Sequence, residues 1–164
     1  DRKANIRVRT IYYDNVTDYV FGGDTPLMLA YKTENINIIK LILKNGGDPD
    51  ESCRWDSPMS MAVMQNKIDI VKLFLENNAN PNKTISNYDG LFEEFFLSYA
   101  VSNKNLELVK LLIMYKANVN SFSNDYESNK QWTALDKAIE VGDQEIIDYL
   151  KSKGAKTTEE LNQN

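Results

Sequence analysis

The chain has 164 residues, of which 42% are hydrophobic, and its formal net charge is −5. Binding to a nucleic-acid duplex needs Lys and Arg side chains against the phosphates, so an acidic chain with no basic stripe argues against that partner. No apolar run approaches the ~18 residues that cross a bilayer. We therefore expect neither a nucleic acid nor a membrane as the main partner.

Histidine is absent, and Cys53 is the single cysteine. The chain therefore has no Ser–His or Cys–His nucleophile pair, no imidazole metal ligand and no intrachain disulfide. Neighbouring carboxylates are expected on exposed loops, whereas acid–base pairs need opposed positions across a cleft. These neighbours are Asp48 with Asp50, Glu93 with Glu94, and Asp125 with Glu127. We expect a protein that is not an enzyme and that holds no cofactor and no metal.

Residues 8–21 consist of two runs of β-branched and aromatic residues around the polar pair Asp14-Asn15. This pattern predicts a β-hairpin with a two-residue turn. Aromatic rings on such a ribbon are of the kind enriched at protein interfaces, although one face of the ribbon can instead pack on the next hairpin. The tyrosines concerned are Tyr12, Tyr13 and Tyr19.

A motif of roughly 33 residues then recurs along the chain. Its clearest copy has Gly23–Ala30, an apolar run at Ile38–Leu43 and a polar close at Asn45–Asp50. A repeat of this length cannot bury its own apolar face, so the copies must stack on one another. The alanines that align the copies are Ala30, Ala62, Ala100 and Ala138.

Each copy carries the local signals of two short helices. Thr25 and Ser57 can cap a first helix, and each is followed by a proline, whose missing N–H costs nothing at a helix start. Thr133 and Asp136 are spaced as in a capping box. The second helix has apolar residues at i, i+3 and i+4 and ends near a Gly or Asn suited to a left-handed turn.

These copies resemble the ankyrin repeat, whose pattern is G-x-T-P-L-H-x-A, then a V-x-L-L-L run, then G-A-x-x-N. The resemblance covers nearly the whole chain in four registered copies. It implies an all-α repeat solenoid in which stacked helix-turn-helix repeats carry projecting β-hairpin fingers, the first of them extended. It also implies a concave face that grips protein partners.

The sequence departs from the ankyrin pattern in two ways. The family's histidine, which ties a helix to neighbouring backbone, is replaced in every copy. The replacing residues are Met28, Ser60, Ser98 and Asp136. The third copy has Phe95 and Phe96 in place of the Thr-Pro pair, and we expect both rings, with Phe92, in the core.

The two ends of the chain carry different signals. Lys3–Arg7 match Lys116–Asn120, which close the third copy, so we expect the chain to open on the tail of another repeat in a longer or processed protein. Near the other end, Lys151 replaces an apolar residue and lets the last helix face water, as in a terminal repeat. Thr158–Leu161 can add one helical turn. We expect one domain, divided into 1–21 (repeat tail and long finger), 22–52, 53–86, 87–124 and 125–164 (C-terminal cap).

Binding residues are expected where the repeats are interrupted. Three of the four fingers are longer than the ankyrin pattern requires, and long surface loops are where repeat arrays place specificity. Beyond the first finger, the candidate contacts in these loops are Arg54, Trp55, Tyr88, Phe122, Tyr126 and Trp132. On the inner helices, position alone recommends Lys32, Thr33, Met64, Gln65, Ser102, Asn103, Glu140 and Val141.

The favoured function is a non-catalytic module that binds an unidentified protein through its concave face and fingers. One alternative is a dedicated inhibitor or immunity-type protein whose acidic fingers block a basic partner's site. Another is a chain that self-associates through the strand edge of the first finger, although we expect a monomer. Cysteine usage leaves the cellular compartment open.

Overall fold

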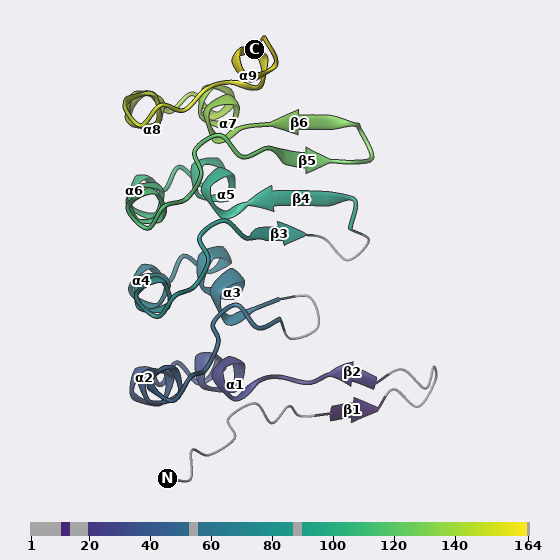
Figure 1. Ribbon diagram of the computed structural model, residues 1–164, viewed down its shortest axis with the longest axis vertical. Coiled ribbons are helices and arrows are strands. Elements are labelled where there is room, and N and C mark those ends of the chain that lie inside the picture. Colours follow the sequence, from purple (N-terminus) through teal and green to yellow (C-terminus); the bar gives the residue numbers. More distant parts are fainter. Residues whose placement is uncertain (1–10, 14–19, 53–55, 87–89, 164) are drawn as a thin grey trace.

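The chain folds into a stack of helix pairs (Figure 1). The structure, a computed structural model, describes residues 11–13, 20–52, 56–86 and 90–163. In each pair an inner helix packs against the outer helix that follows it. The pairs are α1 (Pro26–Lys32) with α2 (Ile36–Lys44), α3 (Pro58–Met64) with α4 (Ile68–Glu76), α5 (Phe96–Ser102) with α6 (Leu106–Met114), and α7 (Ala134–Val141) with α8 (Gln144–Ser152). A short helix, α9 (Thr158–Asn162), follows the last pair. None of the described helices is long and apolar enough to cross a membrane.

Capping residues set the start of most inner helices. The Thr25 hydroxyl accepts from a backbone N–H of the first turn at 3.1 Å, and Ser57 and Thr133 each form a capping box with the residue three positions later. These caps confirm the helix starts that the sequence predicts. The helix α5 begins at Phe96 without a side-chain cap, and the Phe96 N–H instead donates to the backbone carbonyl of Lys83 at 3.2 Å.

Left-handed residues reverse the chain twice in each helix pair. The turn after the outer helix is the one that the sequence predicts. Its left-handed residues are Gly46, Asn78, Lys116 and Gly154. The turn between the inner and outer helices also needs a positive φ, and its residues are Glu34, Asn66, Lys104 and Gly142. Gly142 and Asn66 suit a positive φ, whereas Glu34 and Lys104 do not, so the sequence gives no consistent signal for the turn between the inner and outer helices.

The helix pairs share one apolar core. Ala62, Ala100 and Ala138 are fully buried on the inner helices, where a small side chain lets neighbouring helices approach closely. The outer helices contribute larger buried residues, among them Phe74 and Leu112. The alanines that align the sequence copies are therefore the points at which the inner helices pack.

Antiparallel strands project from the inner helices, on the side away from the outer helices (Figure 1). They are β1 (Ile11–Tyr13), β2 (Val20–Gly22), β3 (Thr84–Ser86), β4 (Phe92–Phe95), β5 (Ser123–Asp125) and β6 (Lys130–Trp132). The first two pair with each other, and the rest form one sheet in the order β3-β4-β5-β6. Because β4 pairs with β5, the fingers that precede α5 and α7 merge into a single sheet. The sequence predicts the fingers separately and gives no signal for this pairing.

The first hairpin differs from the predicted one. Tyr13 pairs with Val20, whereas a turn at Asp14-Asn15 would pair it with Val16, so the register is not the predicted one. Residues 14–19 and the side chains of β1 and β2 lie outside the described part of the chain.

The phenylalanines of the third copy divide between the core and the sheet. Phe96 is fully buried, as predicted. Phe92 and Phe95 lie in β4 and are only partly buried. The Phe92 ring packs against Trp132, with 5.8 Å between the ring centroids. The expectation that all three rings lie in the core is therefore right only for Phe96, because the other two belong to a projecting strand.

Hydrogen bonds join the turns that follow successive outer helices. The Asn82 side chain accepts from a backbone N–H of the next turn at 2.6 Å and donates to a backbone carbonyl of that turn at 3.2 Å. Asn120 repeats both bonds at 2.8 and 3.3 Å. At the first of these junctions the equivalent residue is Asp50. Its Oδ2 accepts from the Asn80 N–H at 2.6 Å, whereas its buried Oδ1 has no hydrogen-bond partner among the described residues.

The C-terminal end of the stack is polar. Lys151 is exposed, whereas the equivalent Leu43 and Leu75 are buried. The helix α9 forms at the predicted residues. Asp136 of α7 holds it, because its Oδ2 accepts from the Thr158 N–H at 2.9 Å and from the Thr158 hydroxyl at 2.6 Å. A residue at the position of the family's histidine therefore ties the last helix to the stack.

Candidate partner-binding surface

The strands extend from the inner helices on the side away from the outer helices (Figure 1). The strand β4 contacts α5, and β6 contacts α7. Residues at the strand ends and on the inner helices therefore lie beside one another. We call the surface formed by β4–β6 with α5 and α7 the concave face.

Glu94 is a buried carboxylate on the concave face. It is 6% exposed, and its Oε1 lies 3.0 Å from the Ser102 hydroxyl, which can donate to it. Burial raises the pKa of Glu94, while the Ser102 hydrogen bond and the positive charge of Lys137 lower it in part. The expectation that Glu93 and Glu94 are both exposed is wrong for Glu94, because neighbouring residues of a strand point to opposite faces.

The Trp132 ring contacts Lys137, which forms an ion pair with Glu140. The ring is 7% exposed, and Lys137 Nζ lies 5.2 Å from its centroid, a distance that suits a cation–π contact. Lys137 Nζ also lies 2.9 Å from Glu140 Oε2, and this hydrogen bond and charge lower the pKa of Glu140. Trp132, a predicted contact residue, is therefore largely buried against Phe92 and Lys137, and its role as a contact stays a prediction.

An open groove of about 560 Å³ lies beside this cluster, between β6, α7 and α9. Ile139 lines it with a half-exposed side chain. The equivalent residues of the other inner helices, Tyr31, Val63 and Val101, are buried. The carboxylates of Glu140 and Glu159 line the same groove. Lys130 lines the groove as well, and Glu140 is paired with Lys137, so the groove offers an apolar contact bordered by charges of both signs, with carboxylates in excess.

The remaining carboxylate pairs have structural roles. The Asp125 side chain accepts from the Ser128 hydroxyl at 2.7 Å and from nearby backbone N–H groups, and these bonds lower its pKa while closing a turn. Asp50 is half-buried at a junction between helix pairs, so the expectation of an exposed pair is wrong for it too. In the residues that the structure describes, no group of three His, Cys, Asp or Glu side chains is placed to hold a metal ion.

Comparison with protein-family models matches residues 8–85 and 60–160 to one described as ankyrin repeats (3 copies). The chain belongs to the ankyrin-repeat family. Ankyrin repeats are generally protein–protein interaction modules, and the family is typically non-catalytic. No curated protein matches the sequence.

The predicted contact residues of this ankyrin chain differ in their exposure and in whether they are already paired with another side chain. Tyr126 is exposed, and its hydroxyl donates to Glu93 Oε2 at 3.2 Å, which raises the pKa of Tyr126. Lys32 is exposed but forms an ion pair with Asp24 at 2.8 Å. Three others are partly buried: Met64, Ser102 and Phe122. Four lie outside the described residues, and two are placed only by the backbone pairing of β1. The former are Tyr19, Arg54, Trp55 and Tyr88, and the latter are Tyr12 and Tyr13.

Sequence reasoning missed Ile139 and Glu94 as residues of the ankyrin concave face. Ile139 had a usable signal, because an apolar residue occupies a stacking position in the last helix pair, where no further inner helix covers it. The burial of Glu94 had none, since it depends on the pairing of β4 with β5 and on the packing of Lys137 and Trp132.

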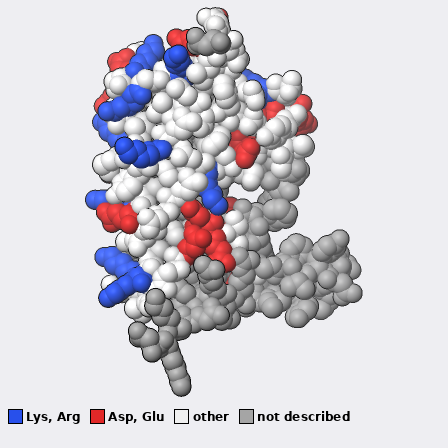
Figure 2. Space-filling view, viewed as in Figure 1, with Lys and Arg blue, Asp and Glu red and all other residues white. Residues whose placement is uncertain are grey.

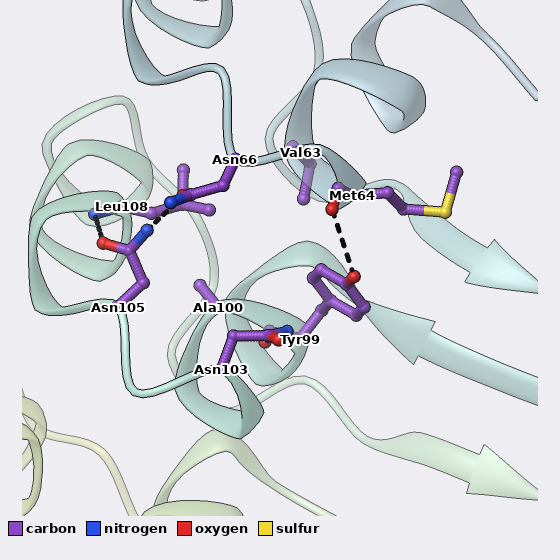
Figure 3. Close-up of a pocket in the computed structure, with 8 residues that line it drawn as sticks. All are labelled: Val63, Met64, Asn66, Tyr99, Ala100, Asn103, Asn105 and Leu108. Atoms are coloured by element: carbon purple, nitrogen blue, oxygen red, sulfur yellow. Dashed lines mark hydrogen bonds between the residues drawn. The ribbon is translucent and has the colours of Figure 1, made fainter.

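A smaller hollow of about 180 Å³ lies between the turns of adjacent ankyrin helix pairs (Figure 3). The Tyr99 hydroxyl donates to the Met64 carbonyl at 3.3 Å. The Asn105 side chain donates to the Asn66 side-chain oxygen and accepts from the Leu108 N–H. Because these polar groups satisfy one another, the hollow belongs to the packing between repeats and offers little to a ligand.

Proposed function

We propose that this chain is a non-catalytic ankyrin module of four repeats that binds a partner protein through its concave face and fingers. The observation that carries the proposal is the open groove between β6, α7 and α9, in which Ile139 is half-exposed. An apolar side chain at a concave site bordered by polar groups has the composition of an interface centre with its rim. Trp132 lines the groove too, but it is only 7% exposed and offers little contact area of its own.

The partner segment that fits this groove has an apolar side chain next to a basic one. Ile139 supplies the apolar contact, and the carboxylates of Glu140 and Glu159 lie on the same lining. Charge complementarity of this kind favours the correct partner and speeds its association. An inhibitor of a protein with a basic site would use the same chemistry, and loss of the partner's activity on binding would distinguish it from a scaffold.

The opposite side of the molecule provides a matched control surface. Figure 2 shows Lys side chains along the edge formed by the outer helices, and Lys40, Lys72 and Lys110 occupy equivalent exposed positions on these helices. Met114 of α6 is an exposed apolar residue on an outer helix. It matches Ile139 in chemistry and exposure but lies outside the groove.

The test compares Ile139→Asp with Met114→Asp. The partner is first captured on the purified chain from the cells that make it and identified by mass spectrometry, and its affinity is then measured by calorimetry. We expect Ile139→Asp to weaken binding by about tenfold or more, because a central apolar contact is lost, and Met114→Asp to change it less than about twofold. Equal effects of the two substitutions would place the partner elsewhere and remove the groove from the proposal.

The first finger is a second part of the proposed contact surface. We infer that it is extended and carries aromatic contacts at Tyr12 and Tyr13, with Trp55 on the next finger. Replacing these three residues together with Ala should weaken capture of the partner. Unchanged capture would show that the fingers at this end are packing elements, and a loss of concentration-dependent light scattering in the variant would instead indicate self-association.

A further inference from the structure

The strand β6 forms an edge of the four-stranded sheet (Figure 1). Among the strands that the structure describes, it pairs only with β5. The backbone groups on its other side are therefore open to a further strand.

The register of the sheet shows that Gln131 is the residue of β6 whose backbone faces the open edge. Successive residues of an antiparallel strand turn their backbone groups to alternate sides. Just beyond the ends of β5 and β4, the Tyr126 N–H donates to the Leu91 carbonyl at 2.8 Å, so Asp125, one residue earlier, turns to β6. Asp125 is paired with Lys130. Gln131, the next residue, then turns its N–H and C=O away from β5.

The connection between α8 and α9 leaves this edge uncovered. Between earlier helix pairs a finger can precede the next inner helix, as β3 and β4 precede α5. After α8 only residues 153–157 precede α9, and the Thr133 hydroxyl ties them to the start of α7 by donating to the Lys156 carbonyl at 2.8 Å. This connection contains no strand. Within the described chain, α9 therefore follows α8 without placing a strand beside β6.

The open edge of β6 lies on the groove of about 560 Å³. The residues of β6 line the groove together with Ile139 of α7 and Glu159 of α9. The Gln131 side chain is turned to Asn124 of β5, with 2.7 Å between Nε2 and Oδ1, whereas the neighbouring Trp132 contacts α7. Because side chains of a strand alternate between its faces, a residue paired with Gln131 would have neighbours whose side chains turn toward α7 and the groove.

We propose that the partner supplies an extended segment that pairs with β6 as a further strand of the sheet. This inference rests on the proposed function of the groove and states how the groove is filled. The backbone of the segment pairs with the N–H and C=O of Gln131, and an apolar side chain next to the pairing residue packs on Ile139. Strand addition of this kind gains affinity from backbone hydrogen bonds and specificity from the alternate side chains.

The charges of the groove favour one basic side chain on the segment. Glu159 is exposed and forms no ion pair with the residues that the structure describes. Glu140 is already paired with Lys137 at 2.9 Å, and Asp136 accepts the hydrogen bonds that hold α9. Lys130 lines the same groove and disfavours a basic run. Charge complementarity therefore selects a segment with a single Lys or Arg, paired with Glu159, near its apolar residue.

The test uses two synthetic peptides, Ser-Thr-Ile-Thr-Lys-Thr-Ser and Ser-Thr-Lys-Thr-Ile-Thr-Ser. In each, the central Thr is placed to pair with Gln131, and the two orders of Ile and Lys allow for either direction of the added strand. At least one peptide should bind saturably at concentrations up to about 1 mM. The Gln131 amide should then exchange with solvent about tenfold more slowly, as measured by nuclear magnetic resonance, because it becomes hydrogen-bonded. Absence of binding by both peptides, or binding that leaves this exchange unchanged, would overturn the proposal.

The matched variants are Gln131→Pro and Gln131→Ala. Proline removes the N–H at the open edge, where a strand tolerates it, and alanine loses the same side chain but keeps the N–H. We expect Gln131→Pro to bind the peptide about tenfold less tightly than Gln131→Ala, because one backbone hydrogen bond is lost. Equal affinities of the two variants would contradict strand pairing. The amide exchange of the original chain decides the question where proline lowers the melting temperature.

The partner identified in the Ile139→Asp experiment separates this inference from the proposed function. If Ile139→Asp weakens partner binding while Gln131→Pro and Gln131→Ala bind the partner equally, the groove binds without an added strand and only this inference fails. If none of the three substitutions weakens partner binding, the proposed function fails as well. A dimer of the chain that Gln131→Pro dissociates would place β6 of a second copy at this edge and would also overturn the proposal.

Discussion

The first and last helix pairs of the stack end in opposite ways. The first pair leaves Ile38 43% exposed, whereas the equivalent residues Ile70, Leu108 and Ile146 are buried. The last pair has an exposed lysine at a stacking position and a short helix held by Asp136. The two pairs have the same architecture, so the character of each end depends on a few register positions and not on the composition of the repeat.

The first junction between helix pairs also differs from the later ones, in the hydrogen bonds of one equivalent side chain. Asn82 and Asn120 each accept and donate a hydrogen bond to the following turn. Asp50 can only accept while it is ionised, and its Oδ1 is left without a partner among the described residues. A change of one amide to a carboxylate therefore leaves the first junction less satisfied than the later ones.

The largest effect should come from removing an apolar side chain at a covered stacking position. Leu108→Ala is expected to lower the free energy of unfolding by about 3 kcal/mol, because it leaves a cavity in the core. Ile38→Ala removes the equivalent but more exposed side chain and should cost less than about 1 kcal/mol. Urea unfolding followed by circular dichroism measures both. Similar losses for the two would mean that Ile38 is already covered in solution.

Removing the Asp136 carboxylate should have the next largest effect. Asp136→Ala takes away the acceptor of the Thr158 and Thr133 hydrogen bonds and is expected to cost about 2 kcal/mol. The matched control is Asp148→Ala on α8, an exposed carboxylate that accepts from Gln144 at 2.8 Å. Hydrogen exchange should show lost protection in α9 for the first variant only. Intact protection there would mean that α9 is held by other contacts.

The features that the sequence predicted correctly depend on local signals. The caps at Thr25, Ser57 and Thr133 and the turn of α9 are each encoded within four residues. The repeat register is encoded by spacing, which carries over from copy to copy. Such signals can be recognised from the sequence alone, because the groups that interact are close to each other in the chain.

The features that it missed depend on distant segments or on strained backbone. The pairing of β4 with β5 joins residues that are 31 and 33 positions apart in the sequence, and along β4 Glu94 is buried while Glu93 is only partly buried. The left-handed turns at Glu34 and Lys104 carry no glycine, so stacking imposes them against local preference. The candidate groove depends on α9 lying beside α7, which the Asp136 and Thr158 hydrogen bonds fix only in three dimensions.

A smaller effect, of opposite sign, should follow from repairing the first junction. Asp50→Asn supplies a side-chain amide where Asn82 and Asn120 already donate, and it is expected to stabilise the chain by about 1 kcal/mol. Asp48→Asn serves as the control, because Asp48 is exposed and its side chain, within the part of the chain that the structure describes, accepts only from the Asp50 N–H. Thermal unfolding compares the two. Equal gains would point to the general reduction of negative charge, and not to the repaired hydrogen bond.

The pKa values of Asp50 and Asp136 are shifted in opposite directions. The stability of the two variants should therefore depend on pH in different ways. Burial raises the pKa of Asp50, while the Asn80 N–H and Lys83 lower it in part. Its contribution to stability is therefore complete below the unfolded value of about 3.9 and is lost as the pH rises through the folded pKa. Asp50→Asn should then gain most at neutral pH and match the original chain below about pH 3.9.

For Asp136, burial opposes ionisation, but the hydrogen bonds from Thr133 and Thr158 outweigh it and lower the pKa. Its contribution is present above about pH 3.9 and is lost as the pH falls through the folded pKa. The cost of Asp136→Ala should therefore stay constant from neutral pH to about 4 and shrink only below it. Unfolding curves of both variants between pH 2 and 7 should change in different windows. If both changed in the same window, the difference between the first junction and the C-terminal end would reflect overall charge and not the local hydrogen bonds.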